Sequence, residues 1–234
     1  MRHWSHPRVA AGLVIGAWAG LFWFLLATDR TMLYLSTRTA WLVPLGAIIA
    51  TAAAIGRLAS ARVPDPQPLG SRETWSLGVV VLPVVILLAL PPVTLGAYAV
   101  GRRSSFSATT LGASARIVSG PIDFVDIAAS QTTEQGQAAL RARAGEVVML
   151  EGFVTIEAGD GPDEFRLTRF IITCCVADAT IAQVRVVGAP PGSVTGDEWV
   201  SVTGRMYPLG NDVLIAANGA PQEIPVPDNP YLTP

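Results

Sequence analysis

Three long apolar stretches near the amino terminus constrain the fold of this chain more than any other feature. They run over Val9–Ala27, Thr39–Gly56 and Leu77–Gly101, and none of them contains a charged side chain. Each reaches the ~17–25 residues that a helix needs to cross about 30 Å of hydrocarbon. The sequence therefore predicts three transmembrane helices and a lipid bilayer as the surroundings of this part of the chain.

The composition supports a membrane protein with a water-facing part. Of the 234 residues, 50% are hydrophobic and only 15% are charged, which is too apolar for a typical soluble domain. Arg2 and Arg8 precede the first apolar stretch, as in a secretory signal peptide. That stretch exceeds the ~7–15 residues of a signal peptide, and further spans follow it, so we interpret it as a retained membrane helix.

The apolar excess ends after about one hundred residues, which predicts separate regions. A membrane region over 1–101 is followed by a linker over 102–120 that is rich in Ser, Thr, Gly and Ala. The remainder, 121–234, is large enough to form one hydrophobic core. We expect it to be a water-facing domain.

Alternating apolar residues predict that this domain is built mainly of β-strands. Two short helices are expected first, at 125–129 and 134–144. Five strands separated by Gly, Pro and Asp are expected at 146–156, 164–174, 181–187, 198–206 and 212–217. This pattern predicts an all-β, OB-like barrel of the small Greek-key type. Gly152 and Gly204 interrupt two of the strands, as expected where a strand bends sharply around a small barrel.

Cys174 and Cys175, the only cysteines of the chain, are adjacent in the sequence. Neighbouring Cα atoms lie about 3.8 Å apart, below the ~4.4–6.8 Å of relaxed disulfides, so the pair is not an ordinary structural disulfide. Three interpretations remain open: two packed, buried thiols, a strained vicinal disulfide with redox character, or soft ligands for a metal ion.

The residues around the pair allow more than one of these interpretations. The apolar run before it predicts a buried strand and favours simple packing of the thiols. Both sulfurs reach one ion only if the strand ends or bulges there. Val176–Asp178 is typical of such an ending, and Asp178 is then a third ligand, an orienting carboxylate or a turn-forming residue. We expect Arg169 to act as a supporting charge, and zinc is a thiophilic ion that such a site would hold.

Other functional classes find little support in the sequence. The net charge is −2, and no basic stripe with interleaved aromatic residues is present, so no role with nucleic acid is expected. The only two histidines lie at the amino terminus, at His3 and His6, which leaves the folded domain without a histidine general base. Phosphate-binding glycine motifs are also missing from the sequence. We therefore expect that the protein is not an enzyme.

Proline and small residues in the third apolar stretch suggest contact with another membrane protein. Pro91 and Pro92 interrupt a helix, and Gly96 and Ala97 permit close approach of a second helix. A simple kink is the alternative. The arginines show a slight positive-inside bias, five against four, which places the C-terminal domain outside the cytoplasm. The cytoplasmic group is Arg2, Arg8, Arg57, Arg62 and Arg72, and the outer group is Arg30, Arg38, Arg102 and Arg103.

Several segments together resemble a known family. They are Tyr34–Arg38, Leu90–Pro92, Gly152–Val154 and, above all, the eleven residues Arg169–Ala179. In these segments the chain resembles the YcgQ-like family of bacterial permease subunits. The resemblance implies a membrane-anchored β-domain subunit that pairs with a polytopic permease and takes part in metal or small-solute handling.

These observations lead to one main hypothesis and two alternatives. The main hypothesis is a multi-pass protein of the cell membrane that serves as the accessory subunit of a two-component permease. The first alternative is a stand-alone, membrane-anchored thiol-redox or metal-delivery protein. The second alternative is a structural anchor with an inert cysteine pair. The transported solute is not indicated by the sequence.

Overall fold

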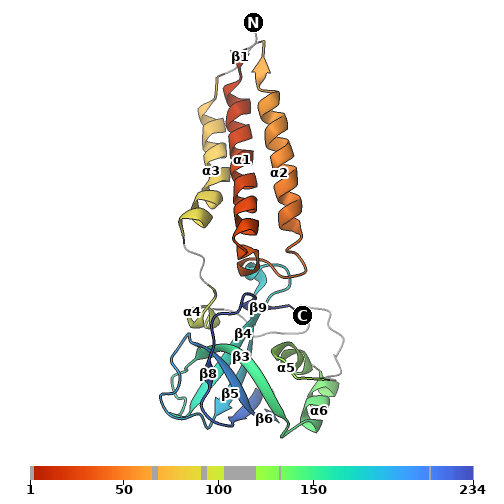
Figure 1. The fold of residues 1–234 in the computed structure, drawn as a ribbon, viewed down its shortest axis with the longest axis vertical. Helices are drawn as coiled ribbons and strands as arrows, with labels where there is room; N and C mark the ends of the chain where they lie inside the picture. The colour runs from red at the N-terminus through yellow and green to blue at the C-terminus, as the bar shows by residue number, and fades with distance from the viewer. Residues whose placement is uncertain are drawn as a thin grey trace. The chain divides into compact units, whose positions relative to one another are not determined.

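The chain forms two compact units, Met1–Val93 and Thr94–Pro234 (Figure 1). The computed structural model describes residues 3–64, 68–90, 94–102, 120–131, 133–210 and 212–233. Apart from Arg102 and Gly120, the predicted linker lies outside these residues. The first unit contains the long apolar helices, and the second contains a β-sheet with short helices.

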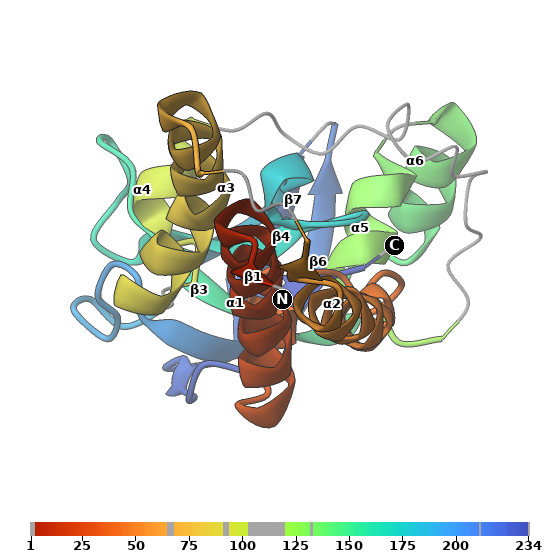
Figure 2. The same cartoon turned by 90° about the horizontal axis from the view of Figure 1, so that it is seen from above.

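Three long helices make up most of the first unit. They are α1 (His6–Ala27), α2 (Leu42–Ala59) and α3 (Ser71–Ala89). Each is long and apolar enough to cross a membrane. Helix α1 lies between α2 and α3 and contacts both, as the view from above shows (Figure 2). Short elements complete the unit: the 3₁₀ helix η1 (Arg30–Leu33) and the paired strands β1 (His3–Trp4) and β2 (Arg62–Val63).

Packing within this unit centres on α1. A Cβ atom on Gly12 would come within 2.8 Å of the Leu58 side chain, so glycine at this position of α1 permits close packing against α2. On the other side, the Trp18 indole donates a hydrogen bond of 3.0 Å to the carbonyl of Val80 in α3. In the most apolar 18-residue stretch of each helix, only 22% of α1, 17% of α2 and 6% of α3 is buried. The remaining apolar surface suits a lipid environment or a partner helix.

The third helix differs from the sequence-based prediction. The stretch Leu77–Gly101 was predicted as one span, but α3 begins at Ser71 and ends at Ala89. Leu90 has an extended backbone with φ −91° and ψ 134°. The physical reason is that a residue before proline disfavours the helical conformation, and proline lacks the N–H that would continue the helix. The residues from Thr94 onward belong to the second unit and include the short helix α4 (Ala97–Val100).

The second unit contains the five-stranded OB-like barrel that the sequence predicted. Its strands are β3 (Val147–Thr155), β4 (Glu164–Ile171), β5 (Thr180–Val187), β6 (Trp199–Leu209) and β7 (Asp212–Ala217). They pair in the order β3-β4-β5-β7-β6, and β6 pairs with β3 to close the barrel. Only the β5–β7 pair among these five is parallel. Two short strands are added, β8 (Gln222–Glu223) beside β6 and β9 (Tyr231–Leu232) beside β4.

Two hydrophobic clusters stabilise the second unit. Alternate residues of the strands fill the first cluster, and the helices α5 (Phe124–Ser130) and α6 (Glu134–Ala142) contribute Phe124, Ile127 and Leu140 to it. Neighbouring residues in the strands point the other way and form the second cluster, around which the segment with α4 packs. Its buried members are Phe153, Phe170, Ile172, Ala179, Ile181, Trp199 and Tyr231.

The two strand glycines lie where neighbouring strands approach most closely. A Cβ atom on Gly152 would lie 2.6 Å from the carbonyl oxygen of Thr168, and one on Gly204 would clash with the carbonyl oxygen of Ala216. Backbone atoms cannot move aside as a flexible side chain does. Both positions therefore need glycine, in agreement with the predicted bends.

Replacing Gly204 by alanine should destabilise the barrel. Because the added methyl group must displace the backbone at Ala216, Gly204→Ala should lower the free energy of unfolding by about 1–3 kcal/mol in a denaturant titration. Gly196→Ala is the matched control, since a Cβ atom there meets nothing within 4 Å. The control should change stability by no more than about 0.5 kcal/mol. Equal stability of the two variants would contradict the close-approach explanation.

Candidate metal centre

The cysteine pair lies in the turn that joins β4 to β5. Strand β4 ends at Ile171, three residues before the predicted end at Cys174, and β5 begins at Thr180. Between them, Val176–Asp178 form a 3₁₀ turn, η3, whose N-cap residue is Cys175. The strand thus ends before the cysteines, which is the condition under which both sulfurs can reach one ion.

The carboxylate of Asp178 organises this turn. Its Oδ1 accepts a hydrogen bond of 2.9 Å from the amide of Thr173, and its Oδ2 accepts one of 2.8 Å from the amide of Cys174. A longer contact of 3.4 Å joins the amide of Cys175 to the same Oδ2. In return, the amide of Asp178 donates to the carbonyl of Cys175 at 3.0 Å. These bonds take the place of a strand ladder and explain why β4 does not continue to the cysteines.

The turn brings three potential ligand atoms together. The sulfurs of Cys174 and Cys175 and a carboxylate oxygen of Asp178 all lie within 4.8 Å of one another. The two sulfurs are 3.7 Å apart, far beyond the length of about 2.05 Å of a disulfide bond. Two thiolates bound to one tetrahedral zinc at about 2.3 Å are separated by about 3.8 Å. The spacing of the two sulfurs is therefore compatible with a shared ion.

The exposure of the cysteines corrects one interpretation. Two packed, buried thiols were one possibility from the sequence, but Cys174 is exposed and Cys175 is only partly buried. The two cysteines do not form a disulfide with each other. For Cys174 the interpretation as a packed, buried thiol is wrong, because β4 ends before this residue and its side chain is exposed in the turn. That the three residues bind a metal ion remains a prediction.

Hydrogen bonding stabilises the protonated form of Cys174. The thiol bonds to the Asp178 carboxylate and to Cys175, which together with partial desolvation raises the pKa of Cys174 to about 12. Burial alone would raise the pKa of Asp178. The bonds from the Cys174 thiol and from the three backbone amides outweigh burial, and the pKa of Asp178 is lowered. A metal ion must therefore displace a proton from Cys174, whereas Asp178 is already ionised at neutral pH.

The elevated pKa of Cys174 argues against the interpretation of the pair as a redox-active dithiol. Reactive cysteines of oxidoreductases act as thiolates and have lowered pKa values. Cys174 is shifted in the opposite direction. A soft cation that replaces its proton fits this electrostatic environment better than a role as an attacking thiolate.

Arg169 is placed differently from the expected supporting charge. Its side chain is buried, with 6% exposed, and its hydrogen bonds go to the carbonyls of Glu151 (3.3 Å) and Asn229 (3.1 Å). The guanidinium lies 5.0 Å from the centre of the Trp199 ring. Burial lowers its pKa to about 10, although the nearby Glu151 opposes this. The contacts described for Arg169 connect it to other strands and to the C-terminal segment, not to the sulfurs.

Of the residues expected to contact a partner, Gly96 and Ala97 are among those that the structure describes. Pro91 and Pro92 lie outside the described residues. Gly96 and Ala97 belong to the second unit, where the amide of Ala97 bonds to the Asp197 carboxylate and a Cβ atom on Gly96 would strike the same group. The expectation that Gly96 and Ala97 form a face of the third membrane helix is therefore wrong.

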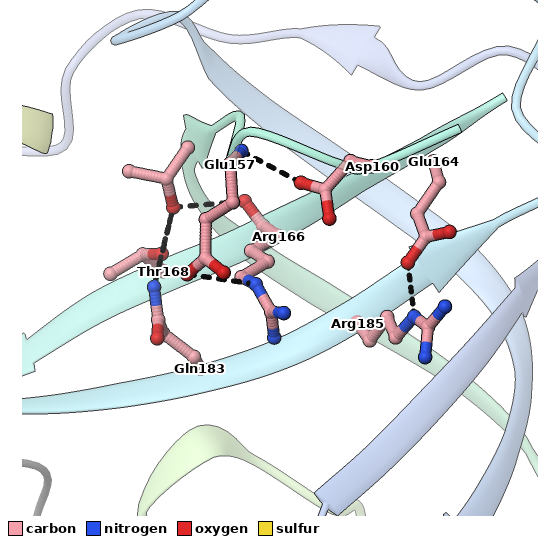
Figure 3. A network of polar contacts seen from close by, with 8 residues as sticks. Glu157, Asp160, Glu164, Arg166, Thr168, Gln183 and Arg185 are labelled. Atoms are coloured by element: carbon pink, nitrogen blue, oxygen red, sulfur yellow. Dashed lines mark hydrogen bonds and ion pairs between the residues drawn. The ribbon is translucent and has the colours of Figure 1, made fainter. Parts of the chain in front are cut away.

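A polar network on β4 and β5 was not singled out from the sequence (Figure 3). The hydroxyls of Thr155 and Thr168 are 2.6 Å apart, and the Gln183 amide donates to Thr168 at 3.0 Å. Nearby, Arg166 pairs with Glu157 at 2.9 Å, and Arg185 pairs with Glu164. Alternate polar residues in both strands were the signal that could have revealed it. These groups bond to one another, so the network mainly stabilises this face of the barrel.

Comparison with known proteins finds a match to a domain family, and it includes the turn. Residues 131–233 match the family described as DUF1980 C-terminal domain, a segment that includes the barrel strands and the cysteine turn. No curated protein matches the chain.

Removing both thiols should abolish metal binding with little effect on the fold. Because serine resembles cysteine in volume but provides no soft thiolate, Cys174→Ser combined with Cys175→Ser should lower Zn²⁺ affinity at least ~100-fold. The free energy of unfolding without metal should change by about 0.5 kcal/mol or less, since Cys174 is exposed. Zn²⁺ titration and denaturant unfolding measure the two effects. A clear loss of stability in a chain whose parent form binds no metal would instead support packing.

Zinc affinity should rise steeply with pH. Since the Cys174 thiol keeps its proton throughout the neutral range, each bound ion must displace that proton. The association constant should increase about tenfold or more per pH unit between about pH 5.5 and 7.5. Titration with Zn²⁺ in matched buffers tests this, and Cys174→Ser should show a shallower dependence. An affinity independent of pH would exclude Cys174 as a ligand.

Proposed function

We propose that this protein is a membrane-anchored accessory subunit of a polytopic permease, and that its β-barrel binds a thiophilic metal ion such as Zn²⁺. The observation that carries the proposal is the turn with Cys174, Cys175 and Asp178, whose ligand atoms lie within 4.8 Å of one another, with Cys174 exposed and the other two residues partly buried. Three protein ligands leave one tetrahedral position open. An open position suits a site that accepts and releases an ion.

The membrane helices support an accessory role. Their ionisable residues are confined to the ends: His6 and Arg8 in α1, Arg57 in α2, and Arg72 and Glu73 in α3. Transport pathways usually place ionisable groups within the hydrocarbon region. Three helices without such groups are better suited to anchoring a domain beside a separate permease.

The match to a domain family is compatible with the same partner class. The match to the DUF1980 C-terminal domain covers the Arg169–Ala179 segment on which the resemblance to the YcgQ-like family mainly rests. That resemblance implies a two-component permease. The stand-alone redox alternative is less favoured because the pKa of Cys174 is raised and not lowered.

Cobalt(II) titration distinguishes the metal site from a redox dithiol. Co²⁺ bound by two thiolates gives ligand-to-metal charge-transfer absorption, which should appear for the parent chain and diminish when either cysteine is replaced by serine. A chain that binds neither Co²⁺ nor Zn²⁺ but cycles between dithiol and disulfide would support the redox alternative.

The barrel should face the extracytoplasmic side of the membrane. This follows from three spans and the slight arginine bias. Gly196→Cys, introduced together with serine at Cys174 and Cys175, places one thiol at an exposed loop where side-chain space is open. A membrane-impermeant thiol reagent should label it in intact cells. Labelling only after lysis would place the barrel in the cytoplasm.

The exposed face of α3 should contact the permease. Trp75, Val79, Leu82 and Ile86 recur with helical spacing and are 45–77% exposed. Part of this face is a groove of about 320 Å³ lined by Thr74, Trp75, Gly78, Val79 and Leu82. Photo-crosslinking residues at the four exposed positions should capture a polytopic partner in native membranes.

Position 84 provides the control for this experiment. Val84 is 3% exposed on the same helix, so a crosslinker there should not reach the partner. A chain that purifies alone in mild detergent, without crosslinks at any exposed position of α3, would contradict the subunit proposal. The stand-alone metal-delivery function would then be preferred.

A further inference from the structure

The C-terminal segment is attached to the strand that leads into the cysteine turn. Strand β9 pairs in parallel with the end of β4, with Phe170 opposite Tyr231 and Ile171 opposite Leu232. The amide of Ile172 then donates a hydrogen bond of 2.9 Å to the carbonyl of Leu232. We call Asn229–Leu232 the C-terminal strap. It holds the backbone up to the residue immediately before the Thr173–Asp178 turn.

Arg169 holds the strap in place from the same strand. One guanidinium nitrogen donates to the carbonyl of Asn229, the first residue of the strap, and another donates to the carbonyl of Glu151 in β3. The guanidinium also lies over the ring of Trp199 in β6. A single buried side chain therefore connects the strap with two barrel strands.

Burial of the Arg169 guanidinium reduces the stability of the fold unless other contacts compensate for it. Removing a guanidinium from water carries a desolvation penalty, which carbonyl acceptors offset only in part. Its Nε has no hydrogen-bond partner among the described residues. An apolar side chain of similar length would pack at lower cost but would leave the strap without its anchor at Asn229.

The strap is also anchored at its other end. The Tyr231 side chain is buried in the second hydrophobic cluster, and its hydroxyl accepts a hydrogen bond of 3.1 Å from the amide of Leu95. With Arg169 at Asn229 and Tyr231 in the cluster, the strap has two fixed points. The hydrogen bond to Ile172 is thereby held firmly at the start of the turn.

We propose that Arg169 and the C-terminal strap position the cysteine turn for metal binding, an inference that rests on the proposed metal site. Arg169 is a positioning residue, since it acts on the turn through Asn229, Leu232 and Ile172. When the strap is released, the end of β4 is free to move and the arrangement of the two sulfurs and the carboxylate is no longer preorganised. Groups that orient metal ligands commonly contribute ~10–100-fold to affinity.

The test is the Zn²⁺ affinity of the full chain in detergent, measured by competition with a chromogenic chelator. Arg169→Met should bind Zn²⁺ at least ~10-fold more weakly than the parent. Arg205→Met is the matched control, because Arg205 also donates to a backbone carbonyl, that of Gly145, but touches no part of the strap. The control should retain parent affinity. Arg169→Lys keeps the cation and should recover part of the loss.

A second variant covers the case in which Arg169→Met does not fold. A chain that ends at Asp228 keeps Arg169 but lacks the strap, and it should show the same loss of affinity with both thiols still titratable. If Arg169→Met or the truncated chain folds and binds Zn²⁺ within about twofold of the parent, the positioning role is overturned, even if thermal stability falls. A parent chain that binds no Zn²⁺ would instead refute the proposed metal site itself.

Discussion

Pairing between β3 and β6 is the interaction on which the second unit depends. The two strands pair from Val147 opposite Arg205 to Phe153 opposite Trp199 and so close the barrel. Closure removes the exposed edges that an open sheet would present. It also requires sharp strand bends, which explains why Gly152 and Gly204 leave no room for a side chain. Closure also places β4 between β3 and β5, so that its end leads into the turn with the cysteines.

The candidate metal centre lies in the turn that directly follows the end of β4. Backbone amides that no longer join the sheet are bonded by the Asp178 carboxylate, and this turns the chain so that both cysteine sulfurs lie near the same carboxylate. The turn-forming and ligand interpretations of Asp178 are thus compatible. A carboxylate has about four acceptor sites, so bonds to two or three amides leave room for an ion.

In the function that we propose, the two units have different roles. The helices offer apolar surface for the bilayer and for a partner, with ionisable groups only at their ends. The barrel offers a small polar site at a turn, where Cys174 is exposed and Cys175 and Asp178 are partly exposed. An exposed site with few ligands suits exchange of an ion with another protein better than permanent storage, because a permanent structural site is usually closed by four ligands.

Local patterns determined much of the fold. Apolar length alone predicts α1 and α2, and period-two alternation predicts β7 at its observed bounds and β5 within one residue. The proximity of Cys174, Cys175 and Asp178 also follows from the sequence, since only four positions separate the first from the last. Short-range spacing and hydrophobic periodicity are properties of a contiguous segment and need no tertiary contact.

Contacts between distant segments decided the rest. The end of β4 is bonded to β9, and the position of Arg169 depends on Asn229, sixty residues away. Gly96 and Ala97 were assigned to a membrane helix because their segment is apolar. In the structure this segment packs on the second cluster of the barrel domain. The sequence by itself determined the first two membrane helices and the order of the five barrel strands. Only the tertiary structure decided which distant residues bond to the end of β4 and to Arg169. Those partners are brought together by the folding of the barrel domain and not by spacing along the chain.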